Sequence, residues 1–179
     1  MKQEITAMDA LFTRRSVRNF TQAPVSEEDL RAILRAGMFA PSAHNGRTWQ
    51  ILTVTDRSKL NALAPMSRWW HMLREAPLCI VCCGHSPELA AMDEELLVQN
   101  SVAATENMLL CIHALGLGGV WLGITPKRPH YEDVKKLLSI PGDVRVVSLI
   151  AVGHPKEPLP CRAAPLERFE EEKWHKEQW

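Results

Sequence analysis

Hydrophobic positions follow two different periods along this chain, and together they predict helices and strands in mixed order. Residues 94–115 carry apolar side chains at helical spacing and are followed by Gly116, so they predict a long central helix. Residues 78–83 are apolar at every position, which is typical of a strand covered on both faces. Residues 144–152 form another continuous apolar run and predict a further strand.

Shorter segments show weaker versions of the same two patterns. Helices are predicted at residues 5–13, 26–37, 57–63, 68–75 and 131–138, and strands at residues 49–55 and 119–123. The second helix opens on Ser26 followed by three acidic residues, a capping pattern, and Gly37 is its expected end. Residues from Lys156 onward are rich in proline and then in charge, which predicts an external arm.

Length and charge limit the possible classes of protein. A chain of 179 residues with 46% hydrophobic and 23% charged residues is expected to fold as one globular domain. Its 21 Lys and Arg residues balance 21 Asp and Glu residues, so no overall charge attracts the protein to nucleic acid or to an anionic membrane. Any site for an anion must therefore be local.

The expected location is the cytoplasm. The first ten residues lack the hydrophobic stretch of a secretory signal, and the five cysteines, an odd number, favour reduced thiols over a disulfide framework. Residues 107–126 carry no charged side chain over a length that could span a bilayer. Because they contain four glycines and His113, we interpret them as a buried helix followed by a buried strand.

A cluster of three arginines and a hydroxyl lies where the first predicted helix gives way to a loop. Arg14, Arg15, Ser16 and Arg18 fall within five residues. Guanidinium groups match phosphate oxygens bidentately and a serine hydroxyl adds a donor, so the cluster favours a phosphate site. The alternative is a solvated basic turn, and the spacing alone does not decide between the two.

Two further segments suggest contact with a flat, polar ring. Pro41, Ser42, Ala43 and Asn45 combine small side chains with a hydroxyl and an amide, which suits the edge of a heterocycle such as the pyrimidine part of a flavin. Residues 119–123 carry glycines that let main-chain amides approach a ring closely. An ordinary turn and a packed strand are the respective alternatives. The glycines of residues 116–119 follow a helix and precede a strand, which excludes a Rossmann fingerprint.

Four motifs in order along the chain resemble the nitroreductase family of FMN-dependent oxidoreductases. They are Arg14-Arg15-Ser16-Val17-Arg18, Ala40-Pro41-Ser42-Ala43-His44-Asn45 with Trp49, residues 114–123, and Gly153-His154-Pro155. The resemblance implies an α+β fold, a sandwich with a central mixed or antiparallel sheet flanked by helices. It also implies a homodimer with two FMN sites at the subunit interface. Residues 1–179 would form a single domain, with about residues 156–179 as an arm on the partner subunit.

The resemblance also implies a role for each matching residue. Arg14 and Ser16, with Arg15 beside them, correspond to contacts with the FMN phosphate and ribityl chain, and Arg18 lies near the pyrimidine ring and the nicotinamide. Pro41, Ser42, Ala43 and Asn45 reach across the dimer to the partner's FMN. Leu122 and Gly123 place their backbone over the ring, with the Gly123 amide near flavin N5. Arg162 completes the phosphate site from the C-terminal arm.

The chain departs from the family pattern at three places. Arg162 stands without the second nearby basic residue that many relatives have. Arg47 and Thr48 stand where relatives often have Gln-Pro, which brings a charge to the flavin edge. The link between His85 and Asp93 is too short to cover the active site as in larger relatives. The segment of residues 68–70 is a candidate to line the pocket instead, although its two tryptophans are also typical of packing.

No metal site is expected. Cys79, Cys82, Cys83 and His85 include potential zinc ligands, but in a strand Cys79 and Cys83 share one face while Cys82 points to the other. One ion could not easily bind all three thiols.

The predicted activity is hydride transfer from NADH or NADPH through flavin N5 to a small acceptor such as a nitroaromatic or quinone, in a ping-pong cycle. The flavin does the chemistry and the protein orients and tunes it. Two alternatives stay open. The same fold could carry out another reductive or flavin-consuming reaction, or the protein could bind flavin as a redox sensor with little turnover.

Overall fold

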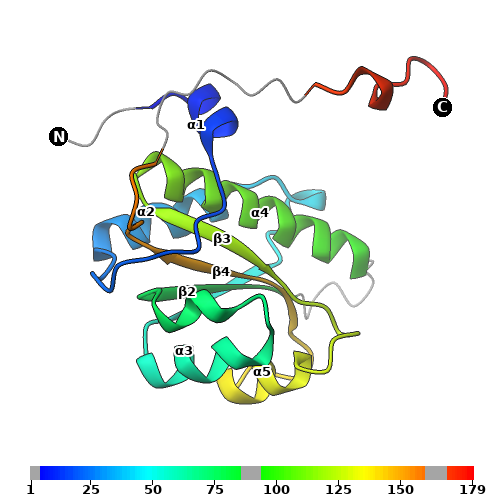
Figure 1. The fold of residues 1–179 in the computed structure, drawn as a ribbon. Coiled ribbons are helices and arrows are strands. Elements are labelled where there is room, and N and C mark those ends of the chain that lie inside the picture. Colours follow the sequence, from blue (N-terminus) through cyan, green and yellow to red (C-terminus); the bar gives the residue numbers. More distant parts are fainter. Residues whose placement is uncertain (1–4, 86–93, 160–168) are drawn as a thin grey trace.

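Four strands form one antiparallel sheet in the order β1-β2-β4-β3, with helices on both of its faces (Figure 1). The computed structural model describes residues 5–85, 94–159 and 169–179. The strands are β1 (Trp49–Val54), β2 (Leu78–Gly84), β3 (Gly118–Gly123) and β4 (Arg145–Gly153). Each neighbouring pair is antiparallel, which confirms the expected α+β sandwich and places β1 and β3 at opposite edges of the sheet.

The helices form two layers, one on each side of the sheet (Figure 1). The first layer contains α2 (Glu27–Met38) and α4 (Glu94–Ala114), with α1 (Ala7–Thr13) against the outer side of α4. The second layer contains α3 (Arg57–Leu63) and α5 (Tyr131–Leu138). Four short 3-10 turns complete the described chain: η1 (Ala43–Asn45), η2 (Ala64–Met66), η3 (His71–Arg74) and η4 (Glu171–Lys173).

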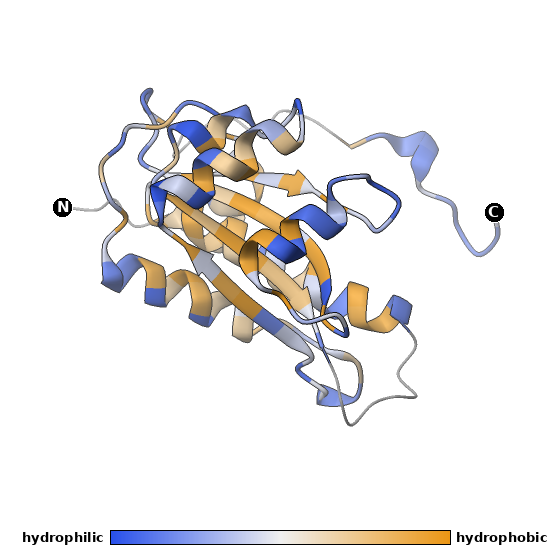
Figure 2. Ribbon diagram, turned by 90° about the horizontal axis from the view of Figure 1, so that it is seen from below, coloured by the Kyte–Doolittle hydropathy of each residue, from blue (hydrophilic) through white to orange (hydrophobic). Residues whose placement is uncertain are grey.

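Strand β2 is buried along its whole length, as its uninterrupted apolar sequence predicts. Cys79, Val81 and Cys83 pack with the α3 and α5 layer, whereas Ile80 and Cys82 pack with the α4 layer. The strands form the hydrophobic centre between helices with hydrophilic outer faces (Figure 2). Burial raises the pKa of the Cys79 and Cys83 thiols to about 12 and that of Cys82 to about 11, so these thiols stay protonated and act as core side chains.

Two glycines expected to end helices have different roles. Gly116 follows α4 with a φ of +75°, the left-handed conformation that ends a helix, as predicted. Gly37 lies inside α2, which continues to Met38, so the prediction for that end was wrong. A Cβ atom on Gly37 would lie 2.8 Å from Cγ of Met108 on α4. The residue is therefore required for the close approach of α2 to α4.

The uncharged residues 107–126 divide between the end of α4 and strand β3, as predicted. Met108, Ile112, Val120 and Leu122 are all buried in the two cores. Among the residues that the structure describes, no helix combines the length and hydrophobicity needed to cross a membrane.

Candidate functional site

The basic segment after α1 is bound to the edge of the sheet at β3. Ser16 forms a parallel bridge with Gly119, and the Val17 amide donates a hydrogen bond to the Gly119 carbonyl over 3.0 Å. Gly118 permits this contact, because a Cβ atom there would lie 2.7 Å from Cγ1 of Val17. The pairing fixes the backbone of the basic cluster beside the glycine-rich strand.

A buried polar contact fixes the start of the same segment. Thr13, the last residue of α1, lies 2.7 Å from Nε2 of His113 on α4. The Thr13 hydroxyl donates its one hydrogen to the Asp9 carbonyl, so His113 is the donor in this contact. Burial, together with the charges of Arg14 and Arg15, lowers the pKa of His113. The imidazole is therefore neutral at pH 7, with its hydrogen on Nε2.

The three arginines of the cluster have different surroundings. Arg15 donates to the main-chain carbonyls of Phe12 and Arg14 at 3.1 and 2.9 Å, so its guanidinium caps the end of α1. Nε of Arg14 lies 3.5 Å from a carboxylate oxygen of Glu106 on α4. Arg18 is exposed and lines two cavities. The three arginines therefore lie in distinct positions, two of them already in contact with groups of the same chain.

The larger cavity has a volume of about 880 Å³ and lies against β3 and the loop that follows it. Its floor consists of buried apolar side chains: Trp70, Met72, Val120, Leu122 and Ile124. Its rim is exposed and basic, with the side chains of Arg18, Arg68, His71 and Arg128. Gly123 also lines it, and a Cβ atom on Gly123 would meet no atom within 4 Å. A flat ring can therefore approach the backbone of β3 here.

A smaller cavity of about 190 Å³ adjoins Arg18 on the other side of the segment. Ser16, Arg18, Pro155 and Pro158 are among its lining residues. The structure thus brings Ser16, Arg18, Leu122 and Gly123 to one region at the β3 edge, as the resemblance implies. Arg162 lies outside the described residues.

The two tryptophans of residues 68–70 have separate roles. Trp70 is 1% exposed and belongs to the core, where its ring meets His130 edge to face, so the packing interpretation holds for this residue. Trp69 is 66% exposed, and the guanidinium carbon of Arg68 lies 4.5 Å from the centre of its ring. Arg68 and Trp69 therefore contribute to the cavity rim.

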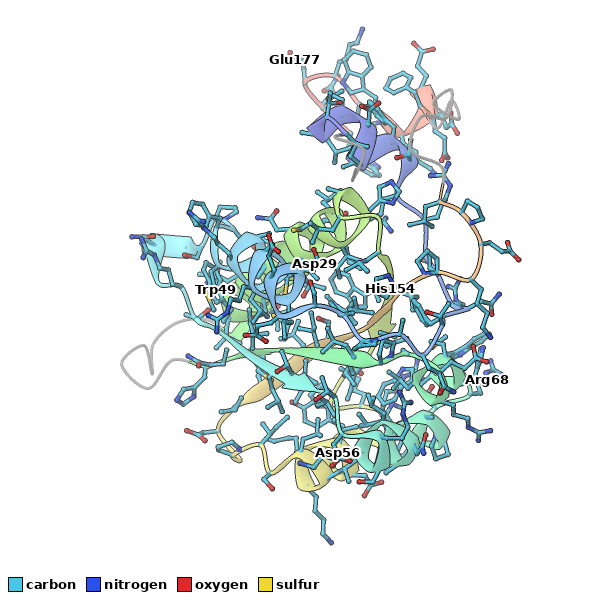
Figure 3. All side chains as sticks on the ribbon, turned by 90° about the vertical axis from the view of Figure 1, so that its left-hand side faces the viewer. Asp29, Trp49, Asp56, Arg68, His154 and Glu177 are labelled. Carbon is cyan, nitrogen blue, oxygen red and sulfur yellow. The ribbon has the colours of Figure 1, made fainter. Side chains whose placement is uncertain are left out.

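The loop that carries Pro41, Ser42, Ala43 and Asn45 lies at the opposite edge of the sheet, before β1. In Figure 3 the side chain of Trp49, the first residue of β1, and that of Arg68 are on opposite sides of the molecule. Within one chain, this loop therefore cannot reach the cavity at β3.

The same loop is held in an unusual conformation. The side-chain oxygen of Asn100 on α4 accepts a hydrogen bond from the Ala43 amide over 2.9 Å. His44, Asn45 and Arg47 all have positive φ angles, of 53°, 55° and 45°. Such angles cost side-chain-bearing residues of order 1 kcal/mol each and cluster at functional sites. Nε of Arg47 also donates to Oδ1 of Asn45 over 3.0 Å, which orients the Asn45 amide.

Two rim residues were not anticipated from the sequence. Arg128 follows β3 by five residues and His71 begins η3, and both line the larger cavity. The only sequence signal for Arg128 was a basic pair, with Lys127, after the glycine-rich strand.

Comparisons with known proteins agree on one family. The profile of the Nitroreductase family matches residues 11–71 and 65–154. A protein of Archaeoglobus fulgidus named "Putative NADH dehydrogenase/NAD(P)H nitroreductase" is 37% identical over 169 residues, 94% of this chain and 96% of that protein.

Solved structures show the same likeness. A crystal structure with that same name from Parabacteroides distasonis has a TM-score of 0.86 at 30% identity and covers 97% of this chain and 98% of its own. A structure from Desulfovibrio desulfuricans, described as "a putative nitroreductase in complex with fmn", has a TM-score of 0.80 at 32% identity and covers 99% of both chains.

Proposed function

This chain belongs to the Nitroreductase family, and we propose that it passes a hydride from NAD(P)H, through N5 of a bound FMN, to a nitroaromatic, quinone or similar acceptor in a ping-pong cycle. The observation that carries this proposal is the cavity beside β3, where Arg18, Leu122 and Gly123 meet. An apolar floor, a basic rim and an accessible glycine backbone suit a flat, anionic cofactor such as FMN. The complex of the Desulfovibrio desulfuricans relative with FMN supports the choice of cofactor.

The residues present fit FMN in both shape and charge. Arg14 and Ser16 would hold the phosphate and ribityl chain, and Arg162 would add a further charge. Arg15 would act mainly through the backbone, because its guanidinium already binds the carbonyls of Phe12 and Arg14 at the end of α1. Leu122 and Gly123 would lie under the ring, with the Gly123 amide donating at N5. Bound FMN supplies the ability to accept and release a hydride.

Arg18 would tune this chemistry electrostatically. Its exposed guanidinium stands between the two cavities, on the segment paired to β3. A positive charge beside the pyrimidine ring stabilises the anionic reduced flavin. Arg18 would therefore raise the reduction potential of a flavin bound in this cavity.

We also propose that the protein works as a homodimer with two FMN sites at its interface. Pro41, Ser42, Ala43 and Asn45 are too far from the cavity of their own chain to contact its flavin, so they would serve the partner's. Exposed apolar side chains would give the interface a hydrophobic surface: Met8, Leu11 and Phe12 on α1, Met38 at the end of α2, Phe39 directly after it, and Val102 on α4. Residues 169–179 extend away from the body and expose Phe169, Trp174 and Trp179, as an arm on the partner would (Figure 1).

A chain that ends at Pro155 tests the role of this arm. All four strands remain, and so does the bridge between Phe20 and Pro155, so the truncated subunit should keep its secondary structure. We expect it to form monomers or aggregates, measured by light scattering coupled to size exclusion. The control is the full chain with Arg162→Ala, which should bind FMN more weakly but stay dimeric. A soluble truncated dimer that retains FMN would refute the proposed arm.

Replacing Gly123 with alanine tests the placement of the ring. The added methyl group meets no protein atom within 4 Å, so the apoprotein should keep its stability within about 0.5 kcal/mol. It would project where the ring approaches the backbone, and we expect FMN affinity to fall about tenfold or more. Gly142→Ala is the matched control, since its methyl group also meets nothing within 4 Å but lies outside the cavity. Equal FMN affinity in the two variants would contradict the placement.

The proposed activity is tested by the visible absorption spectrum of the purified protein, recorded before and after anaerobic addition of NADH and then NADPH. Flavin bands that bleach, and recover when a nitroaromatic or quinone is added, would support the proposal. Bands that persist would favour a flavin-binding sensor or another electron donor. A colourless protein that does not bind added FMN would overturn the proposal.

A further inference from the structure

We propose that the basic rim of the larger cavity selects a planar, negatively charged substrate, with Arg128 and Arg68 as its specificity-determining residues. The inference rests on the proposed function, because this substrate would exchange a hydride with the flavin in the same cavity. The recognised group is a phosphate or a carboxylate attached to, or carried with, an aromatic ring.

The rim of the larger cavity carries charge of one sign only among its described residues. Arg18, Arg68 and Arg128 line the cavity, and none of the described lining residues is Asp or Glu. No described carboxylate lies within ion-pair distance of these three guanidiniums. Arg14 and Arg145 differ in this respect, because they pair with Glu106 and Glu94. Since the chain as a whole has no net charge, this local excess attracts anions specifically to the cavity.

The larger cavity has more arginines than the proposed contacts with FMN would use. In the proposed function, Arg18 lies beside the pyrimidine ring of the flavin. The residues proposed to bind the FMN phosphate lie on the segment after α1. The FMN roles proposed above leave Arg68 and Arg128 unassigned. The cavity volume of about 880 Å³ is near the upper end of the range for small-molecule sites. We therefore expect Arg68 and Arg128 to bind an anionic group of a second ligand that lies beside the flavin.

Trp69 is an exposed aromatic residue on the rim of the larger cavity. Trp69 is two-thirds exposed and its ring carries the Arg68 guanidinium at 4.5 Å. An arginine stacked on an indole keeps its N–H groups free for an anion at the edge, while the indole offers an apolar surface to a flat ring. Figure 3 shows Arg68 at the surface of the molecule. The pair therefore suits a ring with an anionic substituent.

Two substrates share this chemistry. The first is NADPH, whose 2′-phosphate distinguishes it from NADH. The second is an aromatic acceptor that carries a carboxylate. Phosphate and carboxylate both accept bidentate hydrogen bonds from arginine.

The test compares Arg128→Ala, Arg68→Ala and the double variant with wild-type protein. Arg74→Ala is the matched control, because Arg74 is an exposed arginine at the end of η3 that does not line the cavity. Flavin reduction by NADPH and by NADH is followed by stopped flow, and 2′,5′-ADP and 5′-AMP binding by calorimetry. Turnover is measured with 4-nitrobenzoate and with its uncharged methyl ester, and the FMN content of every variant is determined first.

If the 2′-phosphate is the recognised group, Arg128→Ala and Arg68→Ala should each weaken 2′,5′-ADP and NADPH binding about tenfold and leave 5′-AMP and NADH within about twofold. If the carboxylate is recognised, the same variants should raise KM for 4-nitrobenzoate about tenfold and leave the methyl ester unchanged. Either result supports the rim as a charge filter.

Effects equal to those of Arg74→Ala in both arms would overturn the inference, even if NAD(P)H still bleaches the flavin and the proposed function stands. Failure to bind FMN at all would overturn the proposed function instead. The 2′,5′-ADP titration would then still measure the rim on the flavin-free protein.

Discussion

Replacing Arg14 with alanine should release most of the FMN from the protein, with a dissociation constant about 100-fold higher than that of wild type. The segment after α1 is fixed at both ends, by the Thr13–His113 contact and by the pairing of Val17 with Gly119. The Arg14 guanidinium is thus held before the ligand arrives, and a held charge loses little entropy when it binds phosphate. Titration of the apoprotein with FMN, followed by quenching of flavin fluorescence, measures the change.

The ion pair between Arg14 and Glu106 makes this prediction sharper. The Glu106 carboxylate lies 3.5 Å from Nε of Arg14, and it would repel a phosphate bound there. Glu106→Gln should therefore bind FMN a few-fold more tightly, in the opposite direction to Arg14→Ala. Arg31→Ala is the control, because Arg31 pairs with Glu27 on the outer surface of α2. Unchanged FMN affinity in Arg14→Ala would remove Arg14 from the phosphate site.

Much of the fold could be predicted from the sequence, because its main elements have strong hydrophobic periods. The helix at residues 131–138 and the fully buried strand β2 were both found where the pattern placed them. Gly37 was misinterpreted for a physical reason. Its role depends on Met108, some seventy residues away, and no local pattern records such a contact.

The candidate site could be predicted only where its residues are close together in the sequence. Residues 14–18 could be proposed as a phosphate site because such a site needs several donors close together, and a group of donors is visible within one short segment. Capping by Arg15 and the pairing of Arg14 with Glu106 depend on how α1 packs, so the sequence did not indicate them. Residues 68–70 were suggested as pocket lining, but His71 and Arg128 were missed because their segments meet only in the folded chain.

The order of the strands predicts that each FMN site is shared, with its two halves supplied by different subunits. The half with Arg14 and Gly123 lies at the β3 edge, and the half with Ser42 and Asn45 lies before β1 at the other edge. One variant carries Arg14→Ala and Gly123→Ala, and another carries Ser42→Ala and Asn45→Ala. Each alone should bind almost no FMN at a concentration that saturates wild type.

Co-expression of the two defective chains in equal amounts should restore FMN binding at about one quarter of all sites. Half of the dimers then contain both kinds of chain, and each of these has one intact site and one with all four substitutions. If every site were built within a single chain, no mixture of the two variants would bind FMN. The reverse mixture is the control: wild type combined with a chain that carries all four substitutions.

This control should also show about one quarter of the wild-type flavin, because only dimers of two wild-type chains keep intact sites. Sites within single chains would give about one half instead. The pair of mixtures therefore separates a shared site from a self-contained one by two opposite differences, and a general loss of folding cannot imitate both. Flavin absorbance per subunit, measured after size exclusion, provides the readout for both mixtures. Since the two halves stand at opposite edges of one sheet, we expect the shared site.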